Sequence, residues 1–271
     1  MLMHSWFYSL LLVLYIFSLL LYFIDLLQSN RKANRIAFWL LSIVWGLQTV
    51  YFAAKAAQQQ TLLFLSQSDT LFFYAWLIIT FSLLTNWFLK MDLILFSSNI
   101  FGFVIMALSL FRAGREFSPE LAHQLHSEWV FIHIALAFLS YAAFTISFIL
   151  SSVYLVQHAL LKRKKIKHFY RWPSLMQLDK AAFWVNMVGV PLLFMSLVLG
   201  VIWAYHTLEI PIWLDAKVLF SVLVIVLYNL YLYQRLVRGW AGKQLAELNV
   251  ICFLVLLANY LVSTLFTQFH I

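Results

Sequence analysis

The apolar stretch WVFIHIALAFLSYAAFTISFILSSVYLV, Trp129–Val156, decides the fold of this chain. It contains no Asp, Glu, Lys or Arg, and it is longer than the roughly 20 apolar residues that a helix needs to cross the hydrocarbon of a bilayer. A membrane β-barrel would instead alternate polar and apolar residues, which this stretch does not do. We therefore predict a membrane-spanning helix that carries one ionisable residue, His133, about one turn inside its start.

Similar apolar runs recur along the whole chain. Hydrophobic residues make up 64% of its 271 residues and charged residues only 10%, whereas a soluble domain is nearer half apolar and a quarter charged. We predict an all-α fold: a polytopic membrane helix bundle of about eight transmembrane helices, forming a single integral membrane domain over residues 1–271. The predicted spans are Ser5–Leu27, Ile36–Ala54, Leu71–Leu89, Leu93–Phe111, Trp129–Val156, Ala182–His206, Ala216–Gln234 and Leu248–Phe269.

Lysine and arginine residues set the predicted orientation. Fourteen of the 18 lie in the loops after the first, third, fifth and seventh spans, and only Lys55, Arg112, Arg115 and Lys217 lie on the opposite side. The positive-inside rule places the fourteen in the cytoplasm and both chain termini outside. The net charge of +8 then follows from topology and from contact with the anionic headgroups of the lipid bilayer, and we expect no nucleic-acid partner.

Sequence signatures of catalysis are missing from the chain. It has no phosphate loop, no HExxH, no GxSxG and no dinucleotide fingerprint. Acidic residues fall at span ends, so no chain of carboxylates crosses the membrane as a proton pump would require. The single cysteine, Cys252, gives neither a disulfide nor a redox thiol pair. We therefore expect no enzymatic activity.

Six of the eight histidines lie at or near the outer face in this topology. A neutral imidazole is a good iron ligand, and an ionisable group inside a span, such as His133, is costly and often functional. A histidine at the membrane interface is also often only an amphipathic residue with a solvated tip, and this alternative stays open for His4, His123, His126 and His206, and from the residues alone for His133. Ser118-Pro119-Glu120 has the composition of a helix start, and we predict a helix from there into the span that begins at Trp129.

Five stretches together resemble a known family. Their order and spacing are similar to those of the cytochrome c assembly family of haem-handling membrane proteins, which includes CcsA, ResC and CcmC, and most closely to its HemX branch. The stretches are FIDLLQSNRKANR (Phe23–Arg35), DTLFFYAW (Asp69–Trp76), HIALAFLSYAAF (His133–Phe144), GVPLLFMSLVLGVIWA (Gly189–Ala204) and ANYLVSTLFTQFH (Ala258–His270).

The resemblance implies a haem site at the outer face of a bacterial cytoplasmic membrane. His133 and His270 become its axial iron ligands, with His206 or His126 as the alternatives to His270, and the expected cofactor is haem b. The remaining residues expected at this site are Arg112, Arg115 and Lys217 as propionate contacts, with Trp129, Trp213 and Asp215 lining the pocket.

The chain departs from the family pattern in the loop that delivers haem to cytochrome c. Relatives that do so carry a WGxxWxWDxKE signature, of which Asp215 and Lys217 match the Asp and Lys. The tryptophan positions hold aliphatic residues, Trp213 is one place out of register, and the deeper membrane histidine of relatives is replaced by Tyr233. One outer haem site without a delivery loop favours regulation over haem transfer.

The HemX branch is associated with haem biosynthesis, and the resemblance implies that the chain lowers the amount of glutamyl-tRNA reductase, the cytosolic enzyme that starts this pathway. The alternatives are a haem transport or cytochrome c assembly factor that delivers haem at the outer face, and a structural subunit without a cofactor. Basic cytoplasmic residues would contact the reductase, although the KRKKIK run also fits a topology determinant alone. These residues are Lys162, Arg163, Lys164, Lys165, Lys167, Arg235 and Arg238.

Overall fold

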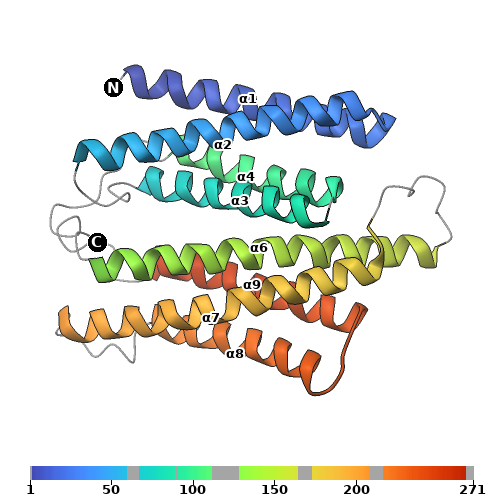
Figure 1. Ribbon diagram of the computed structural model, residues 1–271. Coiled ribbons are helices and arrows are strands. Elements are labelled where there is room, and N and C mark those ends of the chain that lie inside the picture. The colour runs from blue at the N-terminus through green and yellow to red at the C-terminus, as the bar shows by residue number, and fades with distance from the viewer. Residues whose placement is uncertain are drawn as a thin grey trace. The chain divides into compact units, whose positions relative to one another are not determined.

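A computed structural model describes residues 2–59, 67–89, 91–111, 128–163, 173–207 and 216–266. Within these ranges the chain forms eight α-helices and no β-strand (Figure 1). Each helix contains a segment long and apolar enough to cross a membrane. The predicted all-α membrane fold is therefore confirmed. The helices are α1 (Leu2–Gln28), α2 (Arg31–Gln59), α3 (Gln67–Leu89), α4 (Asp92–Phe111), α6 (Glu128–Lys162), α7 (Leu175–Thr207), α8 (Ala216–Leu236) and α9 (Lys243–Phe266).

Several helices extend beyond the predicted spans. α2 begins at Arg31 instead of Ile36, α7 begins at Leu175 instead of Ala182, and α6 continues to Lys162. Hydropathy detects the part of a helix that lies in hydrocarbon, and polar residues continue the same helix into the interface. The helix predicted from Ser118 to the start of α6, and the end of the last span after Phe266, lie outside the described residues.

Polar residues start two of these helices. Asn30 caps α2, because its Oδ1 accepts hydrogen bonds from the backbone N–H groups of Lys32 and Ala33 at 3.1 and 3.3 Å. Ser174 and Gln177 form a capping box at the start of α7, in which each side chain accepts a hydrogen bond from the other residue's backbone N–H at 3.2 and 3.0 Å. These caps satisfy N–H groups that have no partner within the helix.

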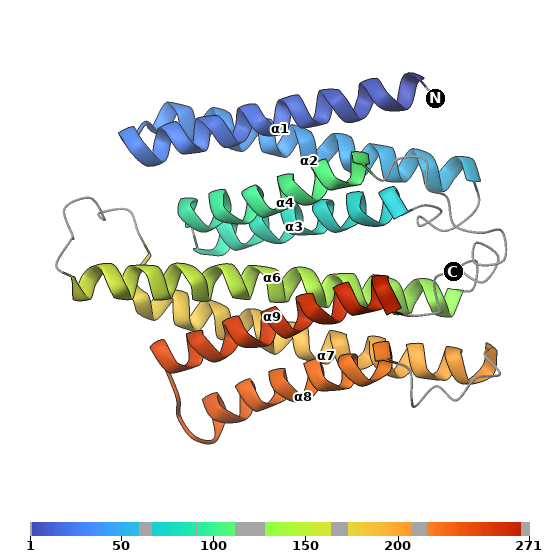
Figure 2. The ribbon, with the colours of Figure 1, turned by 180° about the vertical axis from the view of Figure 1, so that it is seen from behind.

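The described residues separate into two compact units, Met1–His126 and Ser127–Ile271. In the first unit α1 packs against α2 and α4, α3 packs against α4, and α2 touches α3, so the four helices form a ring in chain order (Figures 1 and 2). In the second unit the same order of neighbours joins α6, α7, α8 and α9. Each unit is an up-and-down four-helix arrangement. The single domain expected over residues 1–271 stays a prediction.

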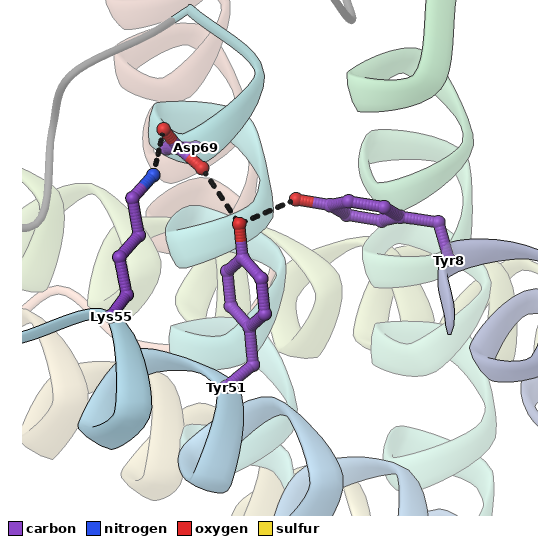
Figure 3. Close-up of polar contacts among 4 residues, drawn as sticks. All are labelled: Tyr8, Tyr51, Lys55 and Asp69. Carbon is purple, nitrogen blue, oxygen red and sulfur yellow. Dashed lines mark hydrogen bonds and ion pairs between the residues drawn. The ribbon is translucent and has the colours of Figure 1, made fainter. Parts of the chain in front are cut away.

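A polar chain joins three helices of the first unit. Tyr8 on α1 donates a hydrogen bond to the hydroxyl of Tyr51 on α2 at 3.1 Å. Tyr51 in turn donates to Oδ1 of Asp69 on α3 at 3.2 Å, and the other carboxylate oxygen forms an ion pair with Lys55 of α2 (Figure 3). The chain therefore ties α1, α2 and α3 together at one end of the unit.

Two tryptophans bridge α2 and α3 further along the same unit. The indole N–H of Trp45 donates to the hydroxyl of Thr80, and that of Trp76 donates to the hydroxyl of Thr49, both at 2.9 Å. Their rings are stacked with 6.4 Å between centroids. Because both indole N–H groups have acceptors, the rings can lie among apolar helices without an unsatisfied donor.

An amide cluster joins three helices of the second unit. Asn249 of α9 donates to the hydroxyls of Ser147 and Ser151 on α6 at 2.8 and 2.7 Å. Its Oδ1 accepts a hydrogen bond from Asn186 of α7 at 2.9 Å. All four residues are buried. Such neutral polar contacts are the usual polar link between helices in a membrane.

Close packing of α6 on α7 brings an aromatic ring against a glycine. A Cβ atom added to Gly189 would lie 2.7 Å from Cε1 of Phe144, which real Cβ atoms essentially never do. The Phe144 ring is stacked on the ring of Tyr228 of α8, with 3.7 Å between the ring centroids. Gly189 therefore allows a ring of α6 to lie directly on the backbone of α7.

Candidate functional site

His133 lies in the second turn of α6 and is half-buried. Its Nδ1 is 2.6 Å from the backbone carbonyl oxygen of Ser196 on α7. Because a carbonyl oxygen only accepts hydrogen bonds, the proton of the neutral ring belongs on Nδ1. The lone pair is then on Nε2, and a histidine that binds a metal through one nitrogen commonly donates the other N–H in this way.

Ser196 makes a second contact with His133 through its side chain. Its hydroxyl donates to the backbone carbonyl oxygen of His133 at 2.9 Å, and the same oxygen lies 3.1 Å from Nδ1. Ser196 is 2% exposed, so these contacts are shielded from water. One residue of α7 therefore holds both the backbone and the ring of His133.

Gly200 lies one turn after Ser196 on α7, and its lack of a side chain leaves room for the His133 ring. A Cβ atom added to Gly200 would lie 2.6 Å from Cε1, 2.9 Å from Nδ1 and 3.2 Å from Nε2 of His133. The ring edge that carries both nitrogens therefore faces the bare backbone of α7. No residue with a side chain fits at this position unless the imidazole moves.

The other residues of the predicted site are described only in part. Trp129 lies at the start of α6 and is 64% exposed. Lys217 and His206 belong to helices α8 and α7, but their side chains are not among those described. The predicted residues outside the described part of the chain are His126, His270, Arg112, Arg115, Trp213 and Asp215.

Comparison with known proteins places this site within a family. The family model described as "Cytochrome C assembly protein" matches residues 62–271, which include His133, Ser196 and Gly200. The chain belongs to the cytochrome c assembly family. Cytochromes c are haem proteins, so membership of this family connects the chain with haem.

Individual relatives support the same assignment. The chain is 47% identical to Protein HemX of Bacillus subtilis (strain 168) over 96% of this chain and 94% of the relative. It is 42% identical to Protein HemX of Brevibacillus brevis over 98% and 97% of the two chains. A cytochrome c biogenesis protein CcsA of Heterosigma akashiwo is 27% identical over 57% of this chain. The predicted resemblance to the HemX branch is confirmed, and the protein is a multi-pass membrane protein of this family.

The predicted partner-binding residues differ in their surroundings. Lys162 and Arg163 at the end of α6, and Arg238 after α8, are exposed. Arg235 instead forms an ion pair with Asp179 of α7 at 2.8 Å and donates to the backbone carbonyl of Trp240 at 3.1 Å. Lys164, Lys165 and Lys167 lie outside the described residues.

Asp179 also organises the turn between α8 and α9. Its Oδ1 accepts a hydrogen bond from the backbone N–H of Gly242 at 3.0 Å. Gly239 and Gly242 have φ values of 70° and 72°, a backbone conformation that favours glycine. Asp179 therefore fixes both Arg235 and the turn that follows it against α7.

Ser196, Gly200 and Asp179 were not predicted as functional residues. A signal for the first two is present in the sequence, because SLVLG places two small residues four apart in an apolar helix. That pattern marks close approach of a second helix in a membrane. It does not say which residue of which helix lies there, and so it could not point to His133.

Proposed function

We propose that this protein binds haem b through His133 and regulates haem biosynthesis from a bacterial cytoplasmic membrane by lowering the amount of glutamyl-tRNA reductase. The hydrogen bond from Nδ1 of His133 to the Ser196 carbonyl carries the proposal. It holds the imidazole in the tautomer that an axial iron ligand requires. Family membership and the HemX relatives support the same conclusion.

In this proposal, residues of the second unit hold the haem. His133 supplies a nitrogen ligand at the start of a membrane helix, and apolar and aromatic residues of the same helix can cover a macrocycle. In the proposal His270 would supply the second histidine ligand, and a haem held by two histidines would have no open position for oxygen chemistry. The other residues of the second unit assigned to this site are Lys217 for a propionate and Trp129, Trp213 and Asp215 for the pocket.

Haem acts in this proposal as a signal and no catalytic step is assigned. A ligand shifts a conformational equilibrium only through different affinities for two states. His133 already contacts α7, so haem on His133 can favour one packing of α6 against α7. Both helices continue to the opposite end of the second unit, where Lys162 and Arg163 are exposed.

Among the basic residues of that end, Arg238 and the run from Lys162 to Lys167 are the better candidates for contact with the reductase. Arg235 serves the fold, since its guanidinium lies 5.4 Å from the ring centroid of Phe183 in addition to its ion pair with Asp179. With both termini outside, as the lysine and arginine distribution predicts, this end faces the cytoplasm.

An absorption spectrum tests haem binding. The detergent-purified protein, reconstituted with haem b, is expected to give a low-spin spectrum of a haem with two histidine ligands, and His133→Ala and His270→Ala are expected to lose it. A protein that takes up no added haem would overturn the proposal. If His270→Ala alone keeps the spectrum, the same measurement on His206→Ala and His126→Ala identifies the second ligand.

A charge-reversal variant tests the cytoplasmic readout. Replacement of Lys164, Lys165 and Lys167 by Glu, three residues of the basic run, is expected to abolish the effect on reductase amount in cells while the haem spectrum stays unchanged. The reductase is measured by quantitative immunoblot beside a deletion strain. Loss of both properties, or of neither, would contradict this division between a haem-binding end and a partner-binding end.

Haem delivery is the second candidate function, and the match to the cytochrome c assembly family favours it. It predicts that deletion of this protein removes covalently bound c-type cytochromes from the membrane, which haem staining of a denaturing gel measures. The aliphatic residues at the tryptophan positions of the delivery loop argue against it, because stacking on haem needs aromatic rings.

A further inference from the structure

We infer that Ser196 and Gly200 of α7 are positioning residues for His133: Ser196 sets the tautomer and Gly200 sets the place of the ring. This inference rests on the proposed function for its consequence in haem binding. The contacts of His133 with α7 do not depend on haem, so the tautomer and the ring position can also be tested in the haem-free protein.

The tautomer follows from the two oxygens of Ser196. With the proton on Nε2, the lone pair of Nδ1 would face the Ser196 carbonyl oxygen at 2.6 Å, which places two acceptors against each other. The Ser196 hydroxyl cannot relieve this, because its hydrogen points to the backbone carbonyl of His133 at 2.9 Å. Both oxygens therefore accept from Nδ1–H, and the ring is held as the Nδ1–H tautomer.

The position of the ring follows from Gly200. The three atoms nearest to an added Cβ are Cε1, Nδ1 and Nε2, so a methyl group at residue 200 meets the edge of the ring that carries its two nitrogens. Removal of this contact requires the imidazole to rotate or α6 to move away from α7. Either change separates Nδ1 from the Ser196 carbonyl.

This arrangement would affect an iron bound by His133. A hydrogen bond from the remote nitrogen of a ligating histidine makes the ligand more basic and fixes the ring orientation, and loss of such a partner typically weakens metal binding 10- to 100-fold. A more basic ligand stabilises ferric over ferrous haem, so α7 would also influence the reduction potential of a bound haem. Gly200→Ala should therefore lower haem affinity about tenfold or more and raise the midpoint potential.

The same helix pair contains a matched control. Gly189 lies eleven residues before Gly200 on α7, and Phe144 lies eleven residues after His133 on α6, so both pairs occur at one interface about three turns apart. An added Cβ at Gly189 would meet Phe144 at 2.7 Å, and at Gly200 it would meet His133 at 2.6 Å. Gly189→Ala thus adds the same methyl group against a ring that has no ligand atom.

The experiment uses the full-length protein in detergent. In the haem-free protein labelled with ¹⁵N-histidine, the nitrogen shifts of His133, assigned by their loss in His133→Ala, are expected to report a protonated Nδ1 and an unprotonated Nε2. After haem b is added, Gly200→Ala should show a Kd for haem about tenfold higher than the wild type and a raised midpoint potential. Gly189→Ala should lower the melting temperature and leave the Kd and the midpoint potential unchanged.

Ser196→Ala adds no atom to the α6–α7 interface, and it replaces Gly200→Ala as the test variant if Gly200→Ala does not fold. It keeps the carbonyl and loses the hydroxyl, so it should give a smaller change in Kd and potential in the same direction. Nε2–H in the nitrogen spectrum, or equal haem properties in Gly200→Ala and Gly189→Ala, would overturn the inference. If the wild-type protein binds no haem, the proposed function fails, and the nitrogen spectrum still decides whether α7 sets the tautomer.

Discussion

The Lys55–Asp69 cluster of the first unit carries two full charges, whereas the Asn249 cluster of the second unit carries none. In the first, Lys55 and Asp69 form an ion pair that Tyr8 and Tyr51 extend by hydrogen bonds. In the second, Asn249 contacts Ser147, Ser151 and Asn186. Each cluster joins three helices of its own unit.

The position of each cluster along its helices accounts for the difference. Lys55 is near the end of α2 and Asp69 near the start of α3, and the Lys55 side chain keeps 17% of its surface exposed. Asn186 and Asn249 lie within spans and are fully buried. A charge in the hydrocarbon costs much more than a neutral amide, so charges are tolerated at helix ends and amides link helices inside.

Removal of one charge from the first cluster should have the largest effect. Asp69→Ala leaves the half-buried Lys55, whose ammonium lies 5.9 Å from the ring centroid of Tyr51, without its carboxylate, and it removes the Asp69 oxygen to which Tyr51 donates. Breaking a buried ion pair costs about 3–5 kcal/mol, and the partial exposure of Lys55 places the expected loss at about 3 kcal/mol. The free energy of unfolding, measured by denaturant titration in detergent, checks this value.

A double variant is the control for the charge itself. Lys55→Met combined with Asp69→Leu removes both charges and should recover most of the lost stability, because apolar residues of similar size replace buried ion pairs at little cost. If the double variant is as unstable as Asp69→Ala, the loss comes from the hydrogen bond to Tyr51 and not from an uncompensated charge.

The neutral cluster should respond less to loss of its central member. Asn249→Ala removes contacts with Ser147, Ser151 and Asn186, and hydrogen bonds between membrane helices contribute on average about 0.6 kcal/mol each. We expect a loss of about 2 kcal/mol in the same titration. Asn229→Ala is the matched control, since the exposed Asn229 donates to the backbone carbonyl of Ile225 within its own helix and its loss should change stability little. A loss above that of Asp69→Ala would reverse the comparison.

The sequence predicted the helices well because hydropathy reports them directly. Each apolar run needs only its own composition to be assigned to a span, and α1, α4 and α8 lie within a few residues of their predicted bounds. His133 could be found for the same reason, as an ionisable residue inside an apolar run. The contact of His133 with Ser196 could not be predicted, because these residues are 63 positions apart in the sequence and meet only through the packing of α6 on α7.

Arg235 illustrates the same limit at the other end of the second unit. Its charge and position in a basic loop favoured a role in partner binding, and nothing local distinguishes it from Arg238. Only the fold brings Asp179 beside it, 56 residues earlier in the chain, while Arg238 stays exposed. A charged residue near a span end can therefore be a fold contact or a binding residue, and tertiary structure separates the two.

Removal of one hydroxyl from each cluster should give the smallest effect and the sharpest comparison. Tyr8→Phe removes the terminal hydroxyl of the charged cluster and keeps the edge-to-face contact with Phe72, which has 5.0 Å between ring centroids. Ser151→Ala removes one acceptor from the neutral cluster. If the clusters differ only in charge, each variant should lose the same amount, about 0.6 kcal/mol.

Unequal losses would show where the charge acts. A Tyr8→Phe variant that loses about 2 kcal/mol would mean that the Tyr8 hydroxyl helps to stabilise the Asp69 carboxylate through Tyr51, because hydrogen bonds to charged groups contribute about 1.5–3 kcal/mol. Tyr8→Phe in the Lys55→Met and Asp69→Leu background then separates the two explanations. With the charges removed, the loss should fall to that of Ser151→Ala, and a loss that stays near 2 kcal/mol would assign the effect to the Tyr8–Tyr51 hydrogen bond itself, independent of the charges.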